Sequence, residues 1–345
     1  MNKKEHSKSK IKNWLLIIAA FFVALIICLW PTNYVIESPG QASPISSLIK
    51  TKSKYNYHNL YYVTVSERPA VLIDYLTSYL RPFDSRYTKK EIQGDASNKQ
   101  YNEIQKYYMQ TSQNNALVYA AKKANVPYSQ KYLGVYVMSI LSNSTFKDKL
   151  QIGDNIQAVN DKNFRSTAQL QSYLNHLAPN TPITLKVIRA KHSLTMTGKT
   201  VKIAGTKQVG IGIQLIDHSQ VKTIPRLAID AGDIGGPSAG LMFSLAAYQY
   251  FIHQKLSITK VAGTGTIDEK GHVGMIGGID KKVVAASKQG IKVFFAPAEQ
   301  PVGIKQRDTN YAEAVRTAKK IHTKMKIIPV NNFNDALSYL NTHKI

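Results

Sequence analysis

Cysteine is nearly absent from this chain: its 345 residues contain one, Cys28. The rest of the chain therefore has no disulfide, and its stability depends on hydrophobic cores. Recognisable metal-binding patterns are missing as well. The nine histidines are scattered, and neither paired cysteines nor an H-E-x-x-H pattern occurs. We therefore expect no metal site and no cofactor.

Acidic residues are also scarce. The chain has 21 of them against 45 lysines and arginines, which gives a net charge of +24. Such a charge normally suggests nucleic-acid binding. The N-terminus argues against that function, because a lysine-rich stretch, 1–12, is followed by a run without any charge, 14–30.

This apolar run predicts a transmembrane anchor over residues 13–30, near the lower length limit for a bilayer-spanning helix. Tryptophan at both ends, Trp14 and Trp30, suits the membrane interface. The lysine-rich tail, 1–12, favours a cytoplasmic N-terminus and places the rest of the chain outside the cell. A cleaved signal peptide is the alternative. In the exterior location nucleic acid is not an expected partner, whereas anionic lipid or cell-wall polymers are; the charge could equally reflect solvated surface lysines.

A phosphate-binding loop is missing too. No G-x-x-x-x-G-K-[ST] pattern occurs, and the nearest string, 193–200, begins with serine instead of glycine. The alternation within that string predicts a strand. We therefore expect an activity that does not use ATP.

The most informative segment that is present reads G-D-I-G-G-P-S-A-G, at 232–240. It places Ser238 between a glycine-rich turn and a helix predicted over Ser238–Phe251. Backbone N–H groups at a helix start can stabilise an oxyanion that forms when a serine attacks a carbonyl. A base is also needed, and G-G-I-D-K-K at 277–282 supplies two lysines; a lysine acts as a base when burial lowers its pKa.

Three spaced motifs resemble the proteolytic domain of Lon-type (S16) serine peptidases: G-P-S-A-G at 236–240, T-G at 264–265 and G-G-[ILV]-x-x-K at 277–282. The resemblance implies that Ser238 is the nucleophile and that Lys282 is the general base. It also implies that a threonine, here Thr264, helps to hold the lysine.

Two glycines, Gly236 and Gly265, are supporting residues in this interpretation, and the backbone around Gly236 and Ser238 would form the oxyanion hole. Lys281 precedes the family lysine by one position and is the less suitable base. The family often has an acidic residue three positions before the serine, where this chain has Gly235. That departure leaves the pair of serine and lysine intact.

A second resemblance covers residues 130–204, where short predicted strands surround one helix. L-Q-I-G-D-N-I-Q-A-V-N at 150–160 is similar to the recurring core of PDZ domains. Such domains bind an extended peptide by adding it as a strand to a sheet edge. The resemblance implies a peptide-binding loop at Leu133, Gly134 and Val135. A purely structural β domain is the alternative.

The sequence thus predicts an α/β multidomain chain. Its expected parts are a cytoplasmic tail (1–12), a transmembrane helix (13–30), an extracellular α/β region (31–129), a PDZ-like β-rich domain (130–204) and a Lon-type proteolytic α/β domain (205–345). The chain resembles membrane-anchored, ATP-independent peptidases of the SepM/YlbL-like kind. The expected substrates are exported peptides or unfolded proteins. The Lon resemblance also implies that a homo-oligomer could form.

Two other functions remain open at this stage. G-x-S-x-G also fits the nucleophile elbow of an α/β hydrolase with a histidine base, for which His272 with Asp268, or His322 with Asp308, are candidates. The chain could also be a PDZ scaffold that binds peptides without cutting them. In that case Ser238 would be an ordinary residue at a helix start.

Overall fold

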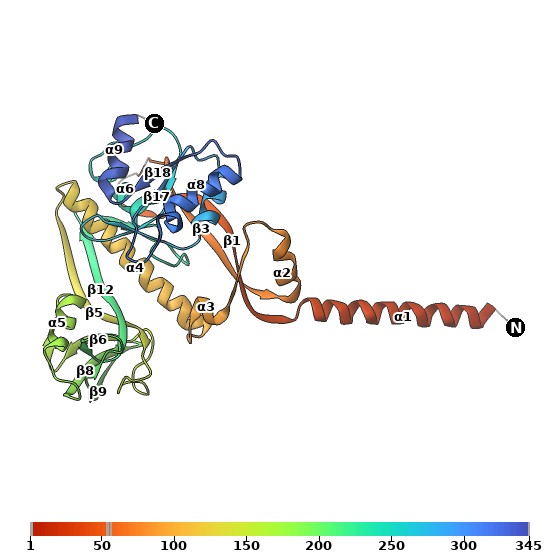
Figure 1. Ribbon diagram of the computed structural model, residues 1–345, viewed down its shortest axis with the longest axis horizontal. Coiled ribbons are helices and arrows are strands. Elements are labelled where there is room, and N and C mark those ends of the chain that lie inside the picture. The colour runs from red at the N-terminus through yellow and green to blue at the C-terminus, as the bar shows by residue number, and fades with distance from the viewer. Residues whose placement is uncertain (1–2, 53–54, 56, 344–345) are drawn as a thin grey trace. The chain divides into compact units, whose positions relative to one another are not determined.

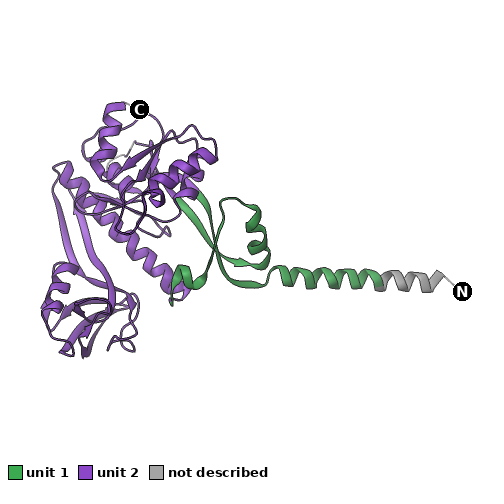
Figure 2. Cartoon of the chain, in the orientation of Figure 1, with its two compact units in different colours: residues 1–40, 64–95 green, residues 41–63, 96–345 purple. Residues whose placement is uncertain are grey.

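The computed structural model describes the backbone of residues 3–52, 55 and 57–343, and side chains from residue 13 onward within these ranges. The chain divides into two compact units (Figure 2): residues 1–40 with 64–95, and residues 41–63 with 96–345. Two strands, β1 (Pro31–Pro44) and β3 (Leu60–Val71), contribute residues to both units. Each unit is described by itself.

The first unit combines a long helix with a small α/β body. Its β1 pairs antiparallel with β4, from Tyr34 opposite Thr88 to Glu37 opposite Ser85. The short helix α3 starts with a capping box in which Thr88 and Glu91 satisfy each other's backbone N–H groups. Besides β1 and β3, the elements of this unit are α1 (Lys3–Cys28), α2 (Leu72–Thr77), η2 (Ser78–Leu80), β4 (Ser85–Thr88) and α3 (Lys89–Gln93).

Helix α1 covers most of the segment expected to form a transmembrane anchor, 13–30. Among the residues that the structure describes, no helix is long and apolar enough to cross a membrane. The expected cytoplasmic tail, 1–12, lies outside the residues whose side chains are described.

The second unit contains the Lon-like region, built around parallel strands that pair in the order β18–β17–β14–β3. All five residues of β17 are buried, which agrees with its apolar sequence, V-F-F-A-P. Helix α6 is buried on nearly all sides and packs against α4 and α9. The elements of this region are β14 (Val261–Gly263), β15 (Thr266–Ile267), β16 (Val273–Gly274), β17 (Val293–Pro297), β18 (Lys326–Val330), α6 (Gly240–Phe251), α7 (Ile279–Lys288), η3 (Gln306–Asp308), α8 (Asn310–Lys320) and α9 (Phe333–His343).

The PDZ-like part of this unit is an antiparallel sheet with strand order β12–β5–β6–β8–β9, and β7 pairs with β6. Its buried core includes Val137, Leu170 and Leu185. Residues 193–199, expected to form a strand instead of a phosphate loop, lie in β9. The elements are β5 (Tyr128–Ile140), β6 (Asn155–Val159), β7 (Lys162–Asn163), α5 (Thr167–Asn175), β8 (Pro182–Arg189), β9 (His192–Lys199), β10 (Val201–Lys202), β11 (Val209–Gly210) and β12 (Ile213–Thr223).

Helix α4 (Asn98–Lys123) connects these two parts of the second unit, since it packs against both β12 and α6 (Figure 1). It begins with a capping box between Ser97 and Gln100. The tertiary contacts of α4 explain its length, because buried residues such as Met109 and Ala120 belong to the core around α6. The remaining elements are η1 (Ile45–Ser47), β2 (Ile49–Thr51) and β13 (Leu227–Ile229), the last two of which pair.

Candidate active site

Ser238 lies in a turn directly before α6 and is partly exposed. The helix begins at Gly240, two residues later than the sequence predicted. The Ser238 carbonyl explains the difference, because it accepts hydrogen bonds from the Thr264 hydroxyl at 2.9 Å and from the Gly265 N–H at 2.8 Å. These bonds take the place of an intrahelical one and hold the serine in the turn.

Lys282 lies in the first turn of α7 and is 3% exposed. Its Nζ is 2.8 Å from Ser238 Oγ and 3.2 Å from Thr264 Oγ1. Residues separated by 44 positions are thus brought to hydrogen-bonding distance. Burial disfavours a charged ammonium group relative to the neutral amine, which is the form that can accept a proton.

Thr264 is fully buried at the carboxyl end of strand β14, where its backbone N–H donates to Phe295 O on β17. Its hydroxyl donates to the Ser238 carbonyl, so the oxygen can only accept from Lys282. This arrangement directs an N–H of the amine toward Thr264. In the neutral amine, the lone pair is then available to Ser238.

Gly265 follows with a φ of +146°, a conformation that side-chain-bearing residues rarely adopt. A Cβ at this position would come within 2.5 Å of a Val273 methyl group. The glycine of the T-G motif is thus required both by its backbone conformation and by the space around it.

Lys281 points to a different environment from that of Lys282, although it is equally buried at 3% exposure. Its Nζ is 3.1 Å from Asp280 Oδ1. Burial raises the pKa of the nearby Glu313, as does the charge of Asp280, while Arg316 and Lys281 act in the opposite direction. The two adjacent lysines therefore differ as their separation of about 100° on a helix requires: one joins a group of charges, and the other faces the serine.

The expected oxyanion hole needs a correction at Gly236. Its N–H donates to the Gln105 carbonyl of α4 at 3.0 Å and is not available to a substrate. Within the described part of the chain, the N–H groups of Ser238 and Ala239 have no hydrogen-bond partner. These two donors, next to the Ser238 hydroxyl, are the better candidates.

Helix α4 contributes contacts that the motifs did not indicate. The buried Ser112 donates its hydroxyl hydrogen to the Pro237 carbonyl at 2.9 Å, directly before the serine. Gly235 faces Gln105 so closely that a Cβ would meet the Gln105 Cβ at 2.6 Å. Ser112 and Pro237 are 125 positions apart, and no local pattern links them.

The structure also shows the surroundings of His272, the candidate base of the alternative α/β-hydrolase interpretation. His272 Nδ1 is 2.9 Å from Asp268 Oδ2, and both side chains are well exposed, at 69% and 48%. The described partner of Ser238 Oγ is Lys282 and not this pair. Among the described residues, no group of three or more His, Cys, Asp or Glu side chains could hold a metal ion.

The sequence predicted a peptide-binding loop in the PDZ-like domain, but the structure has a strand at these residues. Leu133, Gly134 and Val135 lie within strand β5, whose two sides pair with β12 and β6. Gly134 permits the close approach of β6, since a Cβ there would be 2.4 Å from the Ile156 carbonyl oxygen. The edge that a peptide would use at this strand is therefore filled by the chain's own β12.

The far edge of β12 is covered in turn. Thr111 Oγ1 and Asn114 Nδ2 of α4 donate to the carbonyls of Asp217 and Ser219, at 3.3 and 2.8 Å. The opposite outer strand of this sheet is β9.

Comparison with known families finds two matches. The PDZ domain family matches residues 109–200, and the Lon protease (S16) C-terminal proteolytic domain matches residues 190–342. The chain therefore combines a PDZ domain with a Lon-type proteolytic domain, and the latter supports a serine-type peptidase.

Among curated proteins, Lon protease of Campylobacter jejuni is 30% identical over 174 residues, which cover 44% of this chain and 21% of that protein. Lon protease of Aster yellows witches'-broom phytoplasma is 25% identical over 171 residues, 46% of this chain and 20% of that protein. The chain thus spans about a fifth of the length of these relatives. Among solved structures, the PDZ domain of an SdrC-like protein from Listeria monocytogenes is 26% identical with a TM-score of 0.24, and covers 25% of this chain and 90% of that one.

Proposed function

We propose that this protein is an ATP-independent serine endopeptidase that uses a dyad of Ser238 and Lys282. The observation that carries the proposal is the distance of 2.8 Å between Ser238 Oγ and the buried Lys282 Nζ. Hydrogen-bonding contact between a nucleophile and a base that a third group orients is the general signature of an activated nucleophile. Here the third group is Thr264.

In the proposed reaction, Ser238 Oγ attacks the carbonyl carbon of the scissile peptide bond as Lys282 takes the hydroxyl proton. The N–H groups of Ser238 and Ala239 would stabilise the oxyanion. Lys282 then gives its proton to the leaving amine, the C–N bond breaks, and an acyl ester on Ser238 remains. A water molecule, deprotonated by the same lysine, hydrolyses the ester and restores the serine.

Peptides and unfolded proteins are the proposed substrates. The sequence contains no phosphate-binding loop of the G-x-x-x-x-G-K-[ST] type, which supports cleavage without ATP-driven unfolding. We propose that the PDZ domain assists substrate docking. Because β12 occupies the edge of β5 and α4 covers β12, docking by strand addition would use β9 or require β12 to move.

The test is cleavage of a pool of unstructured peptides by the full chain in detergent without ATP. We expect Ser238→Ala and Lys282→Met to abolish cleavage. Lys281→Met is the matched control, because it removes an equally buried neighbouring lysine that faces Asp280. His272→Ala is the control for a histidine base. Normal cleavage by Lys282→Met, or loss of it in His272→Ala, would contradict the proposed dyad.

We also propose a single-pass attachment to the cell membrane, with the N-terminus cytoplasmic and the peptidase domain outside, of the SepM/YlbL-like kind. The apolar run 14–30, the lysines before it and the exposed apolar side chains of α1 support this. The net charge of +24 supports contact with anionic lipid or cell-wall polymers. Release of the chain from membranes by alkaline carbonate would refute the attachment. Sedimentation in detergent tests for a homo-oligomer.

A further inference from the structure

A row of exposed apolar side chains lies on the first unit, along α2 and η2. It consists of Ile73, Leu76, Tyr79 and Leu80, which are 41%, 55%, 61% and 84% exposed. Their spacing of three and four residues places them on one face of the helical stretch 72–80. Among the residues that the structure describes after Trp30, the other exposed large apolar side chains are scattered, at Tyr128, Ile224, Ile258, Val302 and Ile304.

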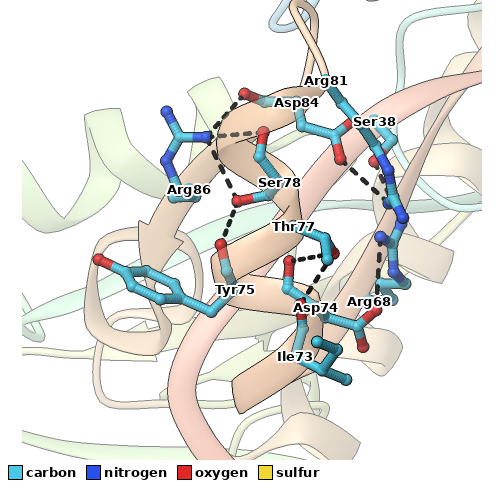
Figure 3. Close-up of polar contacts among 10 residues, drawn as sticks. All are labelled: Ser38, Arg68, Ile73, Asp74, Tyr75, Thr77, Ser78, Arg81, Asp84 and Arg86. Carbon is cyan, nitrogen blue, oxygen red and sulfur yellow. Dashed lines mark hydrogen bonds and ion pairs between the residues drawn. The ribbon is translucent and has the colours of Figure 1, made fainter.

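Two polar residues of the same stretch contact other parts of the first unit. Ser78 is fully buried, and its carbonyl and hydroxyl oxygens accept hydrogen bonds from Arg86 at 3.2 and 3.3 Å (Figure 3). Asp74 pairs with Arg68 at 3.9 Å. A helix on the surface of a water-soluble protein normally presents the opposite pattern, with its apolar face toward the core.

This inverted pattern occurs where the apolar N-terminal segment ends. The N–H of Leu72 donates to the Trp30 carbonyl at 3.0 Å, so the helical stretch 72–80 begins beside the last residue of the apolar run 14–30. Aromatic rings lie along the same stretch: the ring centroids of Tyr34 and Tyr75 are 4.4 Å apart, and the Tyr75 ring contacts that of Tyr79. Tryptophan and tyrosine at this boundary suit a membrane interface.

The charges of the stretch 64–95 indicate that this surface would contact a membrane through its apolar side chains and not through attraction to charged lipids. Its five basic residues are balanced by five acidic ones. The buried Asp84 is paired with Arg81, as Asp74 is with Arg68. The main feature of this surface is therefore the row of apolar side chains, with Tyr75 beside it.

We propose that the row Ile73, Leu76, Tyr79 and Leu80 inserts into the interface of the lipid bilayer that holds the N-terminal segment. This inference rests on the proposed membrane attachment and is independent of the peptidase chemistry. The row acts as a second contact with the bilayer besides the apolar segment. It would thereby limit the orientations of the first unit relative to the membrane surface.

The experiment uses the full chain with Cys28→Ser, which removes the single cysteine. Leu80→Cys then carries an environment-sensitive fluorophore, and the protein is reconstituted into vesicles of phosphatidylcholine and phosphatidylglycerol in equal parts. The vesicles contain lipid with a quencher near the head group. We expect a blue shift of the emission and a loss of about half of the fluorescence, because interfacial helices lie about 5–10 Å into the boundary between head groups and acyl chains.

Ser66→Cys is the matched control. It is exposed on β3 of the same unit and lies six positions before Leu72, about 20 Å along the strand. We expect its label to be unquenched. Equal behaviour of the two labels would overturn the inference, and so would quenching of the Leu80 label that depends on protein concentration, which would indicate contact between copies of the chain.

Flotation of the protein with the vesicles and a catalytically inactive variant distinguish failure of this inference from failure of the proposed membrane attachment or peptidase activity. Failure of the protein to float with the vesicles would refute the membrane attachment itself. Flotation without quenching at Leu80 would refute this inference alone. The same labels in a Ser238→Ala background should give unchanged results, because no catalytic step is involved.

Discussion

Thr264→Val is the substitution that best tests the geometry of the proposed dyad. Valine has nearly the shape of threonine, so the fully buried site stays filled while its hydroxyl is lost. Two hydrogen bonds disappear: the one donated to the Ser238 carbonyl at 2.9 Å and the one accepted from Lys282 at 3.2 Å. The Gly265 N–H still holds the Ser238 carbonyl at 2.8 Å. The main loss is therefore the orientation of the lysine.

The size of the effect follows from these two bonds. Each contributes about 0.5–1.5 kcal/mol, so their loss costs about 1–3 kcal/mol. If that energy is lost from the transition state, kcat falls roughly 5- to 150-fold, since 1.4 kcal/mol corresponds to about a factor of ten. KM should change little, because Thr264 is buried behind the serine and lysine.

The assay is steady-state cleavage of a fluorogenic unstructured peptide by the full chain, with the active fraction determined by a serine-directed acylating probe. Thr264→Ser is the matched control, since it keeps the hydroxyl and loses only a methyl group. We expect it to retain most of the activity. A wild-type rate in Thr264→Val, or an equal loss in Thr264→Ser, would refute the positioning role of the hydroxyl.

Three other predictions follow from the contacts of the second unit. Gly265→Ala should lower the free energy of unfolding by about 2–4 kcal/mol, because the added Cβ meets Val273 at 2.5 Å and the φ is positive. Chemical denaturation measures this free energy, and an unchanged value would contradict the geometry. Ser112→Ala should reduce kcat several-fold through the loss of about 1 kcal/mol at Pro237, while exposed Gln110→Ala should have no effect. Burial lowers the pKa of His218, so as the pH falls the ring is protonated in the unfolded chain before it is protonated in the folded one. The free energy of unfolding should therefore decrease as the pH drops below about 6.5, the ordinary pKa of histidine. His218→Gln should weaken this pH dependence, as measured by thermal unfolding.

The sequence predicted that a PDZ domain precedes a Lon-type proteolytic domain, which the family matches support, and it singled out three residues that the structure brings to hydrogen-bonding distance. Three motifs, each a few residues long, singled out Ser238, Thr264 and Lys282 because they resemble the motifs of Lon-type peptidases. The burial of strand β17 likewise follows from its local sequence, V-F-F-A-P, which contains no polar side chain. Such features depend on neighbours within a few positions.

Three features depended on the tertiary structure instead. The Gly236 N–H is taken by Gln105, the Pro237 carbonyl is held by Ser112, and strand β5 is paired on both sides near Gly134. Each is a contact between segments far apart in the chain, so no local pattern records it. Which lysine faces the serine lies between these cases: the spacing of adjacent helical residues shows that Lys281 and Lys282 must differ, but only the packing of α7 beside the turn at Ser238 decides which of them meets the hydroxyl.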